Sequence, residues 1–179
     1  MDSKKGKILL AHPFLKDPNF KRMVVLICDE TKEGHYGLVL NNSLASLQVD
    51  DFLPEEIGVK LPVLVGGPVE PTYMQYIHCC ESVEGSKGVK DNLWVGGDFE
   101  QVKMFLNLEK IPPEDIRFFI GYAGWADGQL ENEMKNDSWI VADFKWEYLN
   151  YTPEEMWKKV LRDLGKDDLV NYPIDPRLN

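Results

Sequence analysis

The sequence predicts an α+β fold, in which a mixed, largely antiparallel sheet is flanked by a few helices. Segments of strand type outnumber helical ones, and the helical segments come late in the chain. Consecutive strands are joined by short loops, which favours antiparallel pairs because parallel neighbours need a longer crossover. With 44% hydrophobic and 28% charged residues over 179 positions, the composition is that of a globular chain with one core. No linker or internal repeat interrupts it, so residues 1–179 are predicted to form a single domain.

The first strands are the clearest. Lys7–Ala11 is a short apolar strand, and Met23–Cys28 is a continuous apolar run, typical of a strand buried on both faces. Residues 30–34 turn the chain, and Tyr36–Leu40 returns as a strand, which predicts a hairpin with a loop longer than two residues. Asn41 ends this strand, where an Asn side chain can satisfy local backbone groups.

The middle of the chain is less regular. Residues 43–60 are expected to carry one or two irregular helical turns around Phe52–Ile57, and residues 84–90 are expected to form a loop rich in Gly, Ser and Lys. Apolar, aromatic and β-branched content predicts the remaining strands. These lie over residues 61–65, Thr72–Cys79, Leu93–Val95, Ile116–Tyr122 and Trp139–Phe144.

Three helices are predicted from their start signals. Asp98 is followed three residues later by Gln, a variant of the capping box. Asp127 is the expected N-cap of a short helix over Gln129–Lys135, after a tight loop at Ala123–Gly128. Thr152 precedes Pro and two Glu, which is a complete helix start. Residues 171–179 are expected to form an extended, Pro-bearing tail.

The charge balance excludes several partners. Thirty acidic residues against twenty basic ones give a net charge of −10, so nucleic acid and anionic membrane surfaces are disfavoured as partners. The N-terminal apolar run is too short for a signal peptide, and no stretch approaches a membrane helix of about 20 apolar residues. We therefore expect a cytoplasmic protein with no membrane association. Its three cysteines, without a C-x-x-C pair, are expected to be reduced thiols.

Familiar catalytic motifs are absent from the sequence. It has no P-loop, no spaced-glycine dinucleotide loop and no G-x-S-x-G nucleophile elbow. Asp98 stands where a phosphate would meet a helix N-terminus, and its carboxylate would repel one. His12, His35 and His78 occur singly, and each is more typical of a loop or core-edge residue than of a general base. No metal site and no cofactor are predicted.

The segment GYAGWADGQLENE, residues 121–133, is the candidate functional segment. It combines small residues with two amphipathic aromatics, Tyr122 and Trp125, and two polar side chains, Gln129 and Glu131. Small residues let other backbone approach closely, and the four larger side chains could line a site. Alternatively, the glycines only shape the loop and Trp125 fills the core. The residues alone leave both interpretations open.

Four blocks of sequence together resemble a known family. KILLAHPFLKDPNFKRMVVLI, GHYGLVLN, GGPV and GYAGWADGQLENE occur in this order, with Trp139 just beyond, as in the bacterial AlgH/YqgE family. The resemblance covers about residues 5–145. It implies an α+β fold whose branched mixed sheet curls toward a pseudo-barrel. It also implies a cytosolic bacterial protein without an established enzymatic activity, in a family that carries a legacy label of transcriptional regulator.

The matched blocks add Arg22 and Asn41 to the candidate residues. Arg22 either forms a structural ion pair, with Asp17 or Glu131, or belongs to a ligand pocket. The chain departs from the family after Asn41, where many relatives continue Arg-Pro and this chain has Asn-Ser. An Arg contact made there in relatives is therefore missing or altered. The family supplies no agreed catalytic residues, so none is assigned.

Four functions remain as hypotheses. The leading one is a non-enzymatic, ligand- or protein-binding regulatory protein, whose partner is an unknown protein or small molecule. The second is a small-molecule enzyme centred on residues 121–133, with Glu131 as general base. The third is a DNA-binding transcriptional regulator, and a redox role of the cysteines is the fourth and smallest possibility. The candidate ligand-binding residues are Arg22, Asn41, Tyr122, Trp125, Gln129 and Glu131.

Overall fold

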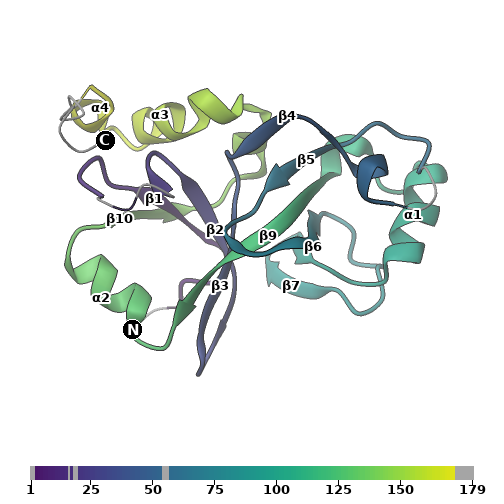
Figure 1. The fold of residues 1–179 in the computed structure, drawn as a ribbon, viewed down its shortest axis with the longest axis horizontal. Coiled ribbons are helices and arrows are strands. Elements are labelled where there is room, and N and C mark those ends of the chain that lie inside the picture. Colours follow the sequence, from purple (N-terminus) through teal and green to yellow (C-terminus); the bar gives the residue numbers. More distant parts are fainter. Residues whose placement is uncertain (1–2, 16, 18–19, 54–56, 172–179) are drawn as a thin grey trace. The chain divides into compact units, whose positions relative to one another are not determined.

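The fold is taken from a computed structural model, which describes residues 3–15, 17, 20–53 and 57–171. Figure 1 labels its helices and strands along the chain. The chain divides into two compact units, one formed by Met1–Asn42 with Ala123–Asn179 and the other by Ser43–Tyr122. Each unit is an α+β structure, and antiparallel strand pairs dominate, as the sequence predicts. The expected single domain over residues 1–179 stays a prediction.

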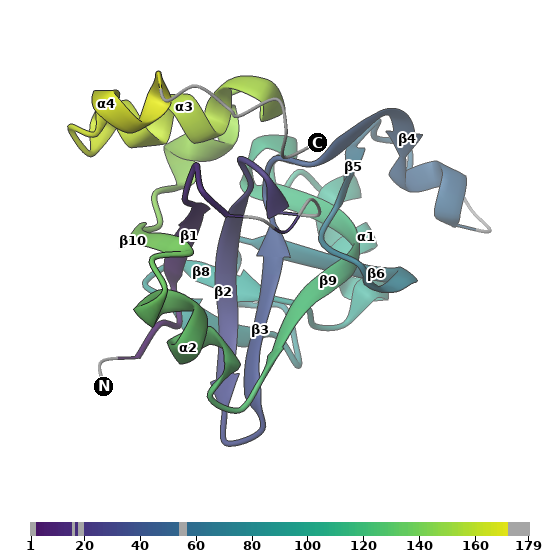
Figure 2. The ribbon, with the colours of Figure 1, turned by 60° about the vertical axis from the view of Figure 1, so that its left-hand side comes forward.

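The first unit is built on an antiparallel sheet in the order β10-β1-β2-β3-β9. Its strands are β1 (Lys7–Ala11), β2 (Val24–Thr31), β3 (Gly34–Val39), the end of β9 (Ile116–Ala126) and β10 (Trp139–Asp143). Figure 2 shows these strands side by side, with helix α2 lying over one face. Residues Val24–Cys28 are fully buried, which confirms that β2 is covered on both faces.

Two loops expected in this unit are shorter than predicted. β2 runs to Thr31, which pairs with Gly34, so the hairpin loop holds two residues rather than more. The loop expected at Ala123–Gly128 is instead strand to Ala126, because these residues pair with Gly34–Gly37 of β3. The small residues of this stretch therefore take part in strand pairing, and this pairing places the candidate segment beside β3.

Among the described residues, the first unit also contains four helical segments. They are α2 (Gln129–Lys135), the 3₁₀ turn η4 (Trp146–Asn150), α3 (Pro153–Asp163) and α4 (Asp167–Val170). α2 is predicted correctly except at its start, because its N-cap is Gly128 in the left-handed region and not Asp127. α3 begins after Thr152 with Pro153 in its first turn, as expected. No described helix is long and apolar enough to cross a membrane.

The second unit contains the mixed part of the sheet. β5 (Pro62–Val65) runs parallel to the first half of β9, and β6 (Val69–His78) runs antiparallel on its other side. β8 (Leu93–Val95) then pairs with β6, and β7 (Lys87–Lys90) pairs with β8. Two of the strands were not predicted. β7 replaces part of an expected loop, and β4 (Ser43–Gln48) pairs with β5 where irregular turns were expected.

A short 3₁₀ turn, η2 (Val49–Phe52), follows β4. The helical turns predicted around Phe52–Ile57 fall partly on residues 54–56, which lie outside the described residues, as does the predicted tail beyond residue 171. α1 (Phe99–Asn107) begins as predicted, because the Asp98 carboxylate accepts a hydrogen bond from the Gln101 backbone N–H at 2.8 Å. A 3₁₀ turn, η3 (Pro113–Asp115), leads into β9.

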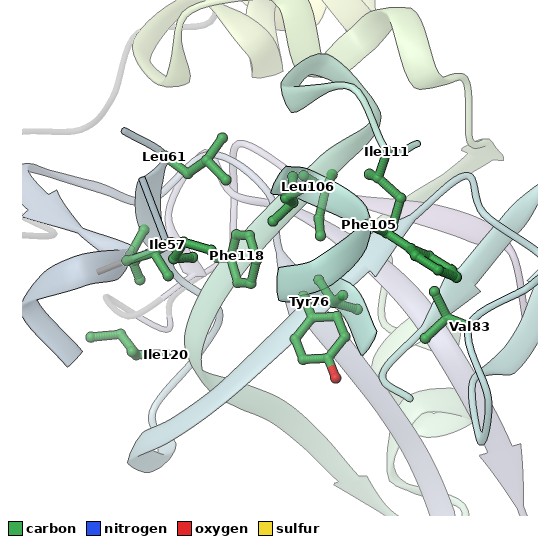
Figure 3. Packing of buried hydrophobic residues seen from close by; sticks show 13 residues of the cluster. Ile57, Leu61, Tyr76, Val83, Phe105, Leu106, Ile111, Phe118 and Ile120 are labelled. Carbon is green, nitrogen blue, oxygen red and sulfur yellow. The ribbon is translucent and has the colours of Figure 1, made fainter. Parts of the chain in front are cut away.

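The core of the second unit lies between α1 and the strands (Figure 3). α1 contributes Val102, Phe105 and Leu106, whose spacing places them on one helix face. Phe118 of β9 is fully buried and stacks at a tilt on Tyr76, with ring centroids 5.6 Å apart. Burial is the main cause that raises the pKa of Tyr76 to about 12. The Tyr76 hydroxyl therefore stays protonated, and it donates a hydrogen bond to the Gly97 carbonyl oxygen.

His78, at the end of β6, is fully buried and hydrogen-bonded through both ring nitrogens. The Cys80 backbone N–H donates to Nδ1 at 3.2 Å, so the proton lies on Nε2, which is 2.9 Å from the Gly96 carbonyl oxygen. Burial lowers the pKa of His78 below its ordinary value of 6.5, and the hydrogen bonds to Gly96 and Cys80 offset this only in part. The folded state therefore favours the neutral imidazole.

This preference predicts a loss of stability at mildly acidic pH. A histidine with a lowered folded pKa stabilises the fold above its unfolded pKa, and this contribution falls as pH drops below about 6.5. We expect the free energy of unfolding, measured with urea, to decrease as the pH is lowered from 7 to 5. The His78→Gln variant should be less stable at pH 7 but should show a flatter slope, and His12→Gln is the matched control for loss of an imidazole. An unchanged slope in His78→Gln would assign the acid sensitivity to other groups.

Candidate functional site

The structure does not bring the six candidate residues to one place. In β3, His35 pairs with Trp125 near the hairpin end of the sheet, whereas Asn41 follows the opposite end of the strand. Six residues of extended chain separate these ends by about 20 Å. Trp125, Gln129 and Glu131 therefore lie near the hairpin end, and Arg22 and Asn41 lie near the other. Tyr122 pairs with Val69 in the second unit and is half-buried.

Asn41 joins three chain segments through its side chain. Its amide donates to the carbonyl oxygens of Arg22, at 3.0 Å, and Pro153, at 3.3 Å, and its Oδ1 accepts from the Val24 N–H at 2.8 Å. All of its hydrogen-bonding atoms are thus used within the fold. The sequence-based expectation that Asn41 satisfies backbone groups at the strand end is confirmed.

Arg22 packs on an aromatic ring. Its guanidinium carbon lies 5.5 Å from the ring centroid of Trp157, which is the geometry of a cation–π contact. The Glu131 carboxylate lies beside His35 instead, so the predicted ion pair of Arg22 with Glu131 is not formed, and the pair with Asp17 stays a prediction. Trp157 itself is buried and donates its Nε1–H to the Ala11 carbonyl at 2.9 Å. Arg22 therefore covers a core aromatic side chain.

Most of the polar groups of the candidate segment converge on Glu133. Its Oε2 accepts the indole N–H groups of Trp125, at 2.9 Å, and Trp139, at 2.7 Å. Its Oε1 accepts from the Gln129 amide at 2.9 Å, and the Gln129 Oε1 in turn accepts from the Ala126 backbone N–H at 3.0 Å. We call these four side chains, Trp125, Gln129, Glu133 and Trp139, the Glu133 lock.

The two tryptophans of the Glu133 lock belong to the core, whereas Gln129 is exposed. Trp125 and Trp139 are buried, their rings pack edge to face with centroids 6.0 Å apart, and Phe20 contacts both. Because buried indole N–H groups need acceptors, one carboxylate that serves two of them ties α2 to the sheet. For Trp125 and Gln129, the architectural interpretation of the motif is the one that the contacts support.

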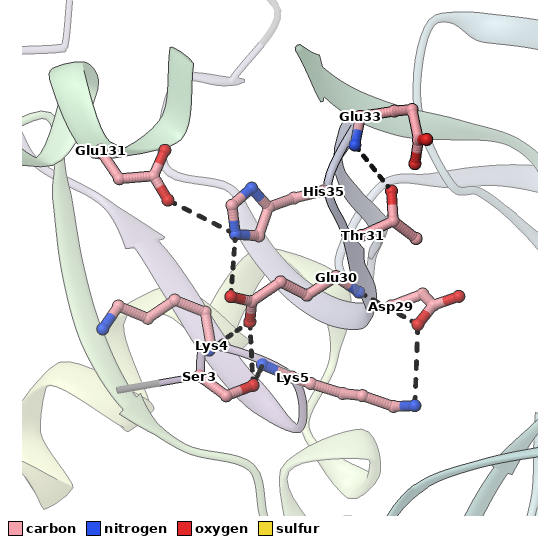
Figure 4. Close-up of polar contacts among 9 residues, drawn as sticks. All are labelled: Ser3, Lys4, Lys5, Asp29, Glu30, Thr31, Glu33, His35 and Glu131. Atoms are coloured by element: carbon pink, nitrogen blue, oxygen red, sulfur yellow. Dashed lines mark hydrogen bonds and ion pairs between the residues drawn. The ribbon is translucent and has the colours of Figure 1, made fainter. Parts of the chain in front are cut away.

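Glu131 is two residues from both Gln129 and Glu133 along α2, so it lies on a different helix face and has different neighbours. Its Oε1 lies 3.6 Å from Nε2 of His35, and the Glu30 Oε1 lies 3.8 Å from the same nitrogen (Figure 4). The His35 side chain is only 5% exposed, while those of Glu131 and Glu30 are 28% and 33% exposed. We call these three residues the His35 cluster. β2, β3 and α2 each supply one of its members.

Glu30 also binds the N-terminal residues. Its Oε2 accepts from the Ser3 hydroxyl and from the Lys4 backbone N–H, both at 2.8 Å. Burial raises the pKa of Glu30, but the hydrogen bonds from Lys4 and Ser3 and the nearby His35 outweigh it, and the net effect lowers that pKa. Glu30 is therefore a stable carboxylate with one oxygen engaged and the other directed at His35.

The His35 cluster contains polar atoms that the fold does not satisfy. Both ring nitrogens of His35 and the Oε2 of Glu131 are buried and have no hydrogen-bond partner among the described residues. Such atoms are rare in proteins and each calls for an explanation, often a functional one. The residues that the structure describes contain no group of three or more His, Cys, Asp or Glu side chains placed to hold a metal ion.

Two residues important here were not among the candidates. Glu133 was detectable, because Gln129 and Glu133 are four residues apart and share a helix face that Glu131 does not share. His35 was not detectable, because its proximity to Glu131 depends on the pairing of β3 with β9 across 90 residues of chain.

Comparisons with known proteins agree with the fold. A family model described as AlgH-like matches residues 8–168. A UPF0301 protein of Cytophaga hutchinsonii is 40% identical over 180 residues, covering 98% of this chain and 98% of the relative. A UPF0301 protein of Bacteroides thetaiotaomicron is 36% identical over 179 residues, covering 98% and 91%.

Two solved structures share the architecture. Protein DIP2367 from Corynebacterium diphtheriae aligns with a TM-score of 0.77 at 21% identity, over 96% of this chain and 94% of that one. The solution structure of the AlgH protein from Pseudomonas aeruginosa aligns with a TM-score of 0.74 at 25% identity, over 92% of each chain. Together with the matching model and relatives, these likenesses show that the chain belongs to the AlgH-like family.

Proposed function

We propose that this protein is a non-enzymatic binding protein with a regulatory role in the bacterial cytoplasm, and that its binding site is the His35 cluster. The observation that carries the proposal is the contrast between two neighbouring glutamates. Glu133 has both oxygens hydrogen-bonded within the fold, whereas among the described residues Glu131 has a buried oxygen without a hydrogen bond, beside a buried imidazole that makes none.

This contrast separates architecture from recognition within one helix. Unsatisfied buried polar atoms cost stability, roughly 1–3 kcal/mol each, so a fold under selection for stability alone would not keep three of them together. A ligand that supplies the missing hydrogen bonds recovers this free energy on binding. The Glu30 and Glu131 side chains beside the ring are 33% and 28% exposed.

The alternative of a small-molecule enzyme has one specific observation in its favour. A carboxylate beside an imidazole is an arrangement suited to proton transfer, and Glu131 was the predicted general base. The Ser3 hydroxyl in this region donates to Glu30 and not to His35. The enzyme therefore remains the second candidate.

A DNA-binding role is the weakest candidate. It would need exposed cations on a helix, and α3 is the helix with the most basic residues. There the Lys159 ammonium lies 3.3 Å from the Glu155 carboxylate, and Arg162 lies 3.8 Å from Asp167. With a net charge of −10, these paired cations offer little to phosphates.

A thermal-shift screen tests the proposed function. Wild type and Glu131→Gln are heated with amines, amino acids, organic acids, nucleotides and sugars. Each sample is compared with one that contains only the counter-ion of that compound. At about 100 times its Kd, a ligand of the His35 cluster should raise the Tm of wild type by about 5 °C or more and leave Glu131→Gln unshifted. The bound compound should be recovered unchanged. Conversion of the compound would favour the enzyme, and a screen without any Glu131-dependent shift would contradict a binding role for the cluster.

A further inference from the structure

The turn between β9 and α2 holds the only Asp-Gly pair of the sequence, Asp127-Gly128. Both residues are exposed. In an Asp-Gly pair the backbone nitrogen of the glycine can attack the aspartate side chain, because glycine has no Cβ that obstructs the approach. The product is a five-membered imide ring. The pair is therefore a place where the chain can alter its own backbone without an enzyme.

The fold leaves both reacting groups of this pair unengaged. Among the residues that the structure describes, the Asp127 carboxylate accepts no hydrogen bond and forms no ion pair, and the Gly128 N–H donates to no acceptor. Gly128 has a φ of +72°, and a Cβ built on it would meet nothing within 4 Å. The carboxyl group and the nitrogen can therefore react without breaking a hydrogen bond to another described residue.

Asp137, just beyond the other end of α2, provides the contrast. It is also exposed and is also followed by a small residue, Ser138. The Ser138 N–H, however, donates to the Glu133 carbonyl oxygen at 3.0 Å, so the nitrogen that would attack is held in a hydrogen bond. Asp127 and Asp137 thus differ in the freedom of the next backbone nitrogen and not in their exposure.

We propose that Asp127 converts spontaneously to isoaspartate in the folded protein, and that this modification loosens α2. The Gly128 nitrogen loses its proton and forms a bond to the Asp127 Cγ, while the bond from Cγ to one carboxyl oxygen breaks and that oxygen leaves as water. One water then opens the imide. Attack at Cγ restores aspartate, and attack at the main-chain carbonyl carbon leaves Gly128 joined through Cγ. The water lost in the first step is regained in the second, so no oxidant, reductant or co-reactant is needed.

Isoaspartate adds one carbon, the Cβ of residue 127, to the main chain between β9 and α2. The Gln129 side chain spans this link, since its Oε1 accepts from the Ala126 N–H at 3.0 Å and its amide donates to Glu133 at 2.9 Å. Ala126 in turn pairs with Gly34 of β3. We therefore expect α2 and its Gln129 contacts to shift rather than the paired strand. This consequence does not depend on a ligand at the His35 cluster.

Ageing of the purified full chain tests the modification. Wild type is kept folded at neutral pH and physiological temperature for several weeks and is then digested, and electron-transfer mass spectrometry of the peptides distinguishes isoaspartate from aspartate. Relative to an unaged sample, isoaspartate should accumulate at residue 127 and not at residue 137. Asp127→Glu, which keeps the charge but would need a six-membered ring, should abolish the signal. Gly128→Ala adds a Cβ beside the attacking nitrogen and should reduce the signal several-fold.

A urea-unfolded sample of the same chain separates the effect of the sequence from that of the fold. Absence of isoaspartate at residue 127 of the folded protein overturns the proposal, and its presence in urea alone would show that the fold protects the turn. Equal accumulation at 127 and 137 in the folded protein would also contradict it, because the free nitrogen would then play no part. The isoaspartate fraction, isolated by ion exchange, should show faster amide exchange in α2 than the unmodified chain, with α3 unchanged. Equal exchange in α2 would refute the loosening.

Discussion

Replacement of Glu133 by Ala is expected to destabilise the protein by about 3 kcal/mol, because it leaves two buried indole N–H groups without an acceptor. Trp125 and Trp139 both donate to the same Glu133 oxygen, and Gln129 donates to the other. Loss of these three hydrogen bonds removes the link between α2 and the sheet beneath it. Urea unfolding at neutral pH, followed by tryptophan fluorescence, measures the change.

The control series for Glu133 distinguishes the hydrogen bonds from the charge. Glu133→Gln keeps one acceptor oxygen and should cost about 1 kcal/mol, while Glu154→Ala removes an exposed glutamate of α3 and should change stability by less than about 0.5 kcal/mol. If Glu133→Ala were as stable as Glu154→Ala, the Glu133 lock would not hold the core, and the architectural role of the motif would be wrong.

Replacement of Gly34 by Ala is expected to have a similar effect, about 3 kcal/mol or more, for a steric reason. Gly34 has a φ of +137° and pairs with Ala126, and a Cβ placed there would overlap the carbonyl oxygen of Trp125. The overlap involves backbone, so no side-chain rotation relieves it. The β3–β9 pairing, which positions His35 and Trp125, has to open. Urea unfolding and amide exchange of β3 report both effects.

Gly128 provides the matched control. It also has a positive φ, +72°, but a Cβ there would meet nothing within 4 Å. Gly128→Ala should therefore cost only the backbone strain, about 1 kcal/mol. Equal costs for the two variants would mean that the close approach of β3 and β9 does not matter and that only the φ angle does.

Local patterns predicted the strands and helices whose residues carry strong signals. The apolar run of β2 and the helix start at Asp98 needed no knowledge of their neighbours. β7 was missed because its Gly and Lys residues have little strand preference, and only Val89 in it is buried. It forms because Lys90 pairs with Leu93 across a two-residue turn at Asp91 and Asn92, a hairpin signal that was available in the sequence.

The end of β9 was mistaken for a loop for a related reason. Gly and Ala residues are typical of loops, but here Ala123 and Ala126 pair with Gly37 and Gly34 of β3. A Cβ on Gly37 would lie 2.7 Å from the Leu26 carbonyl oxygen of β2 and 3.3 Å from the Trp125 ring, so the absence of a side chain at 37 makes room for both. Such pairing of small residues on one strand with a large residue on another becomes visible only once the register is known.

The candidate site was predicted in part. The segment at 121–133 is the right place, and Glu131 is in the His35 cluster. Asn41 and Trp125 were chosen because they stand in distinctive motifs, yet their polar atoms are used within the fold. A distinctive motif marks residues that cannot vary freely, and a buried indole that needs an acceptor imposes as strict a requirement as a ligand does. Only the count of used and unused hydrogen bonds separates the two.

The different roles of Glu131 and Glu133 are tested most directly by the free energies of unfolding of Glu131→Ala and Glu133→Ala, measured side by side without ligand. A glutamate kept for binding contributes little to the stability of the free protein, and its removal is neutral or stabilising. We expect Glu131→Ala to lie within about 0.5 kcal/mol of wild type or above it, and Glu133→Ala to fall by about 3 kcal/mol. Equal losses in the two variants would show that Glu131 also serves the fold and would contradict a binding site at His35.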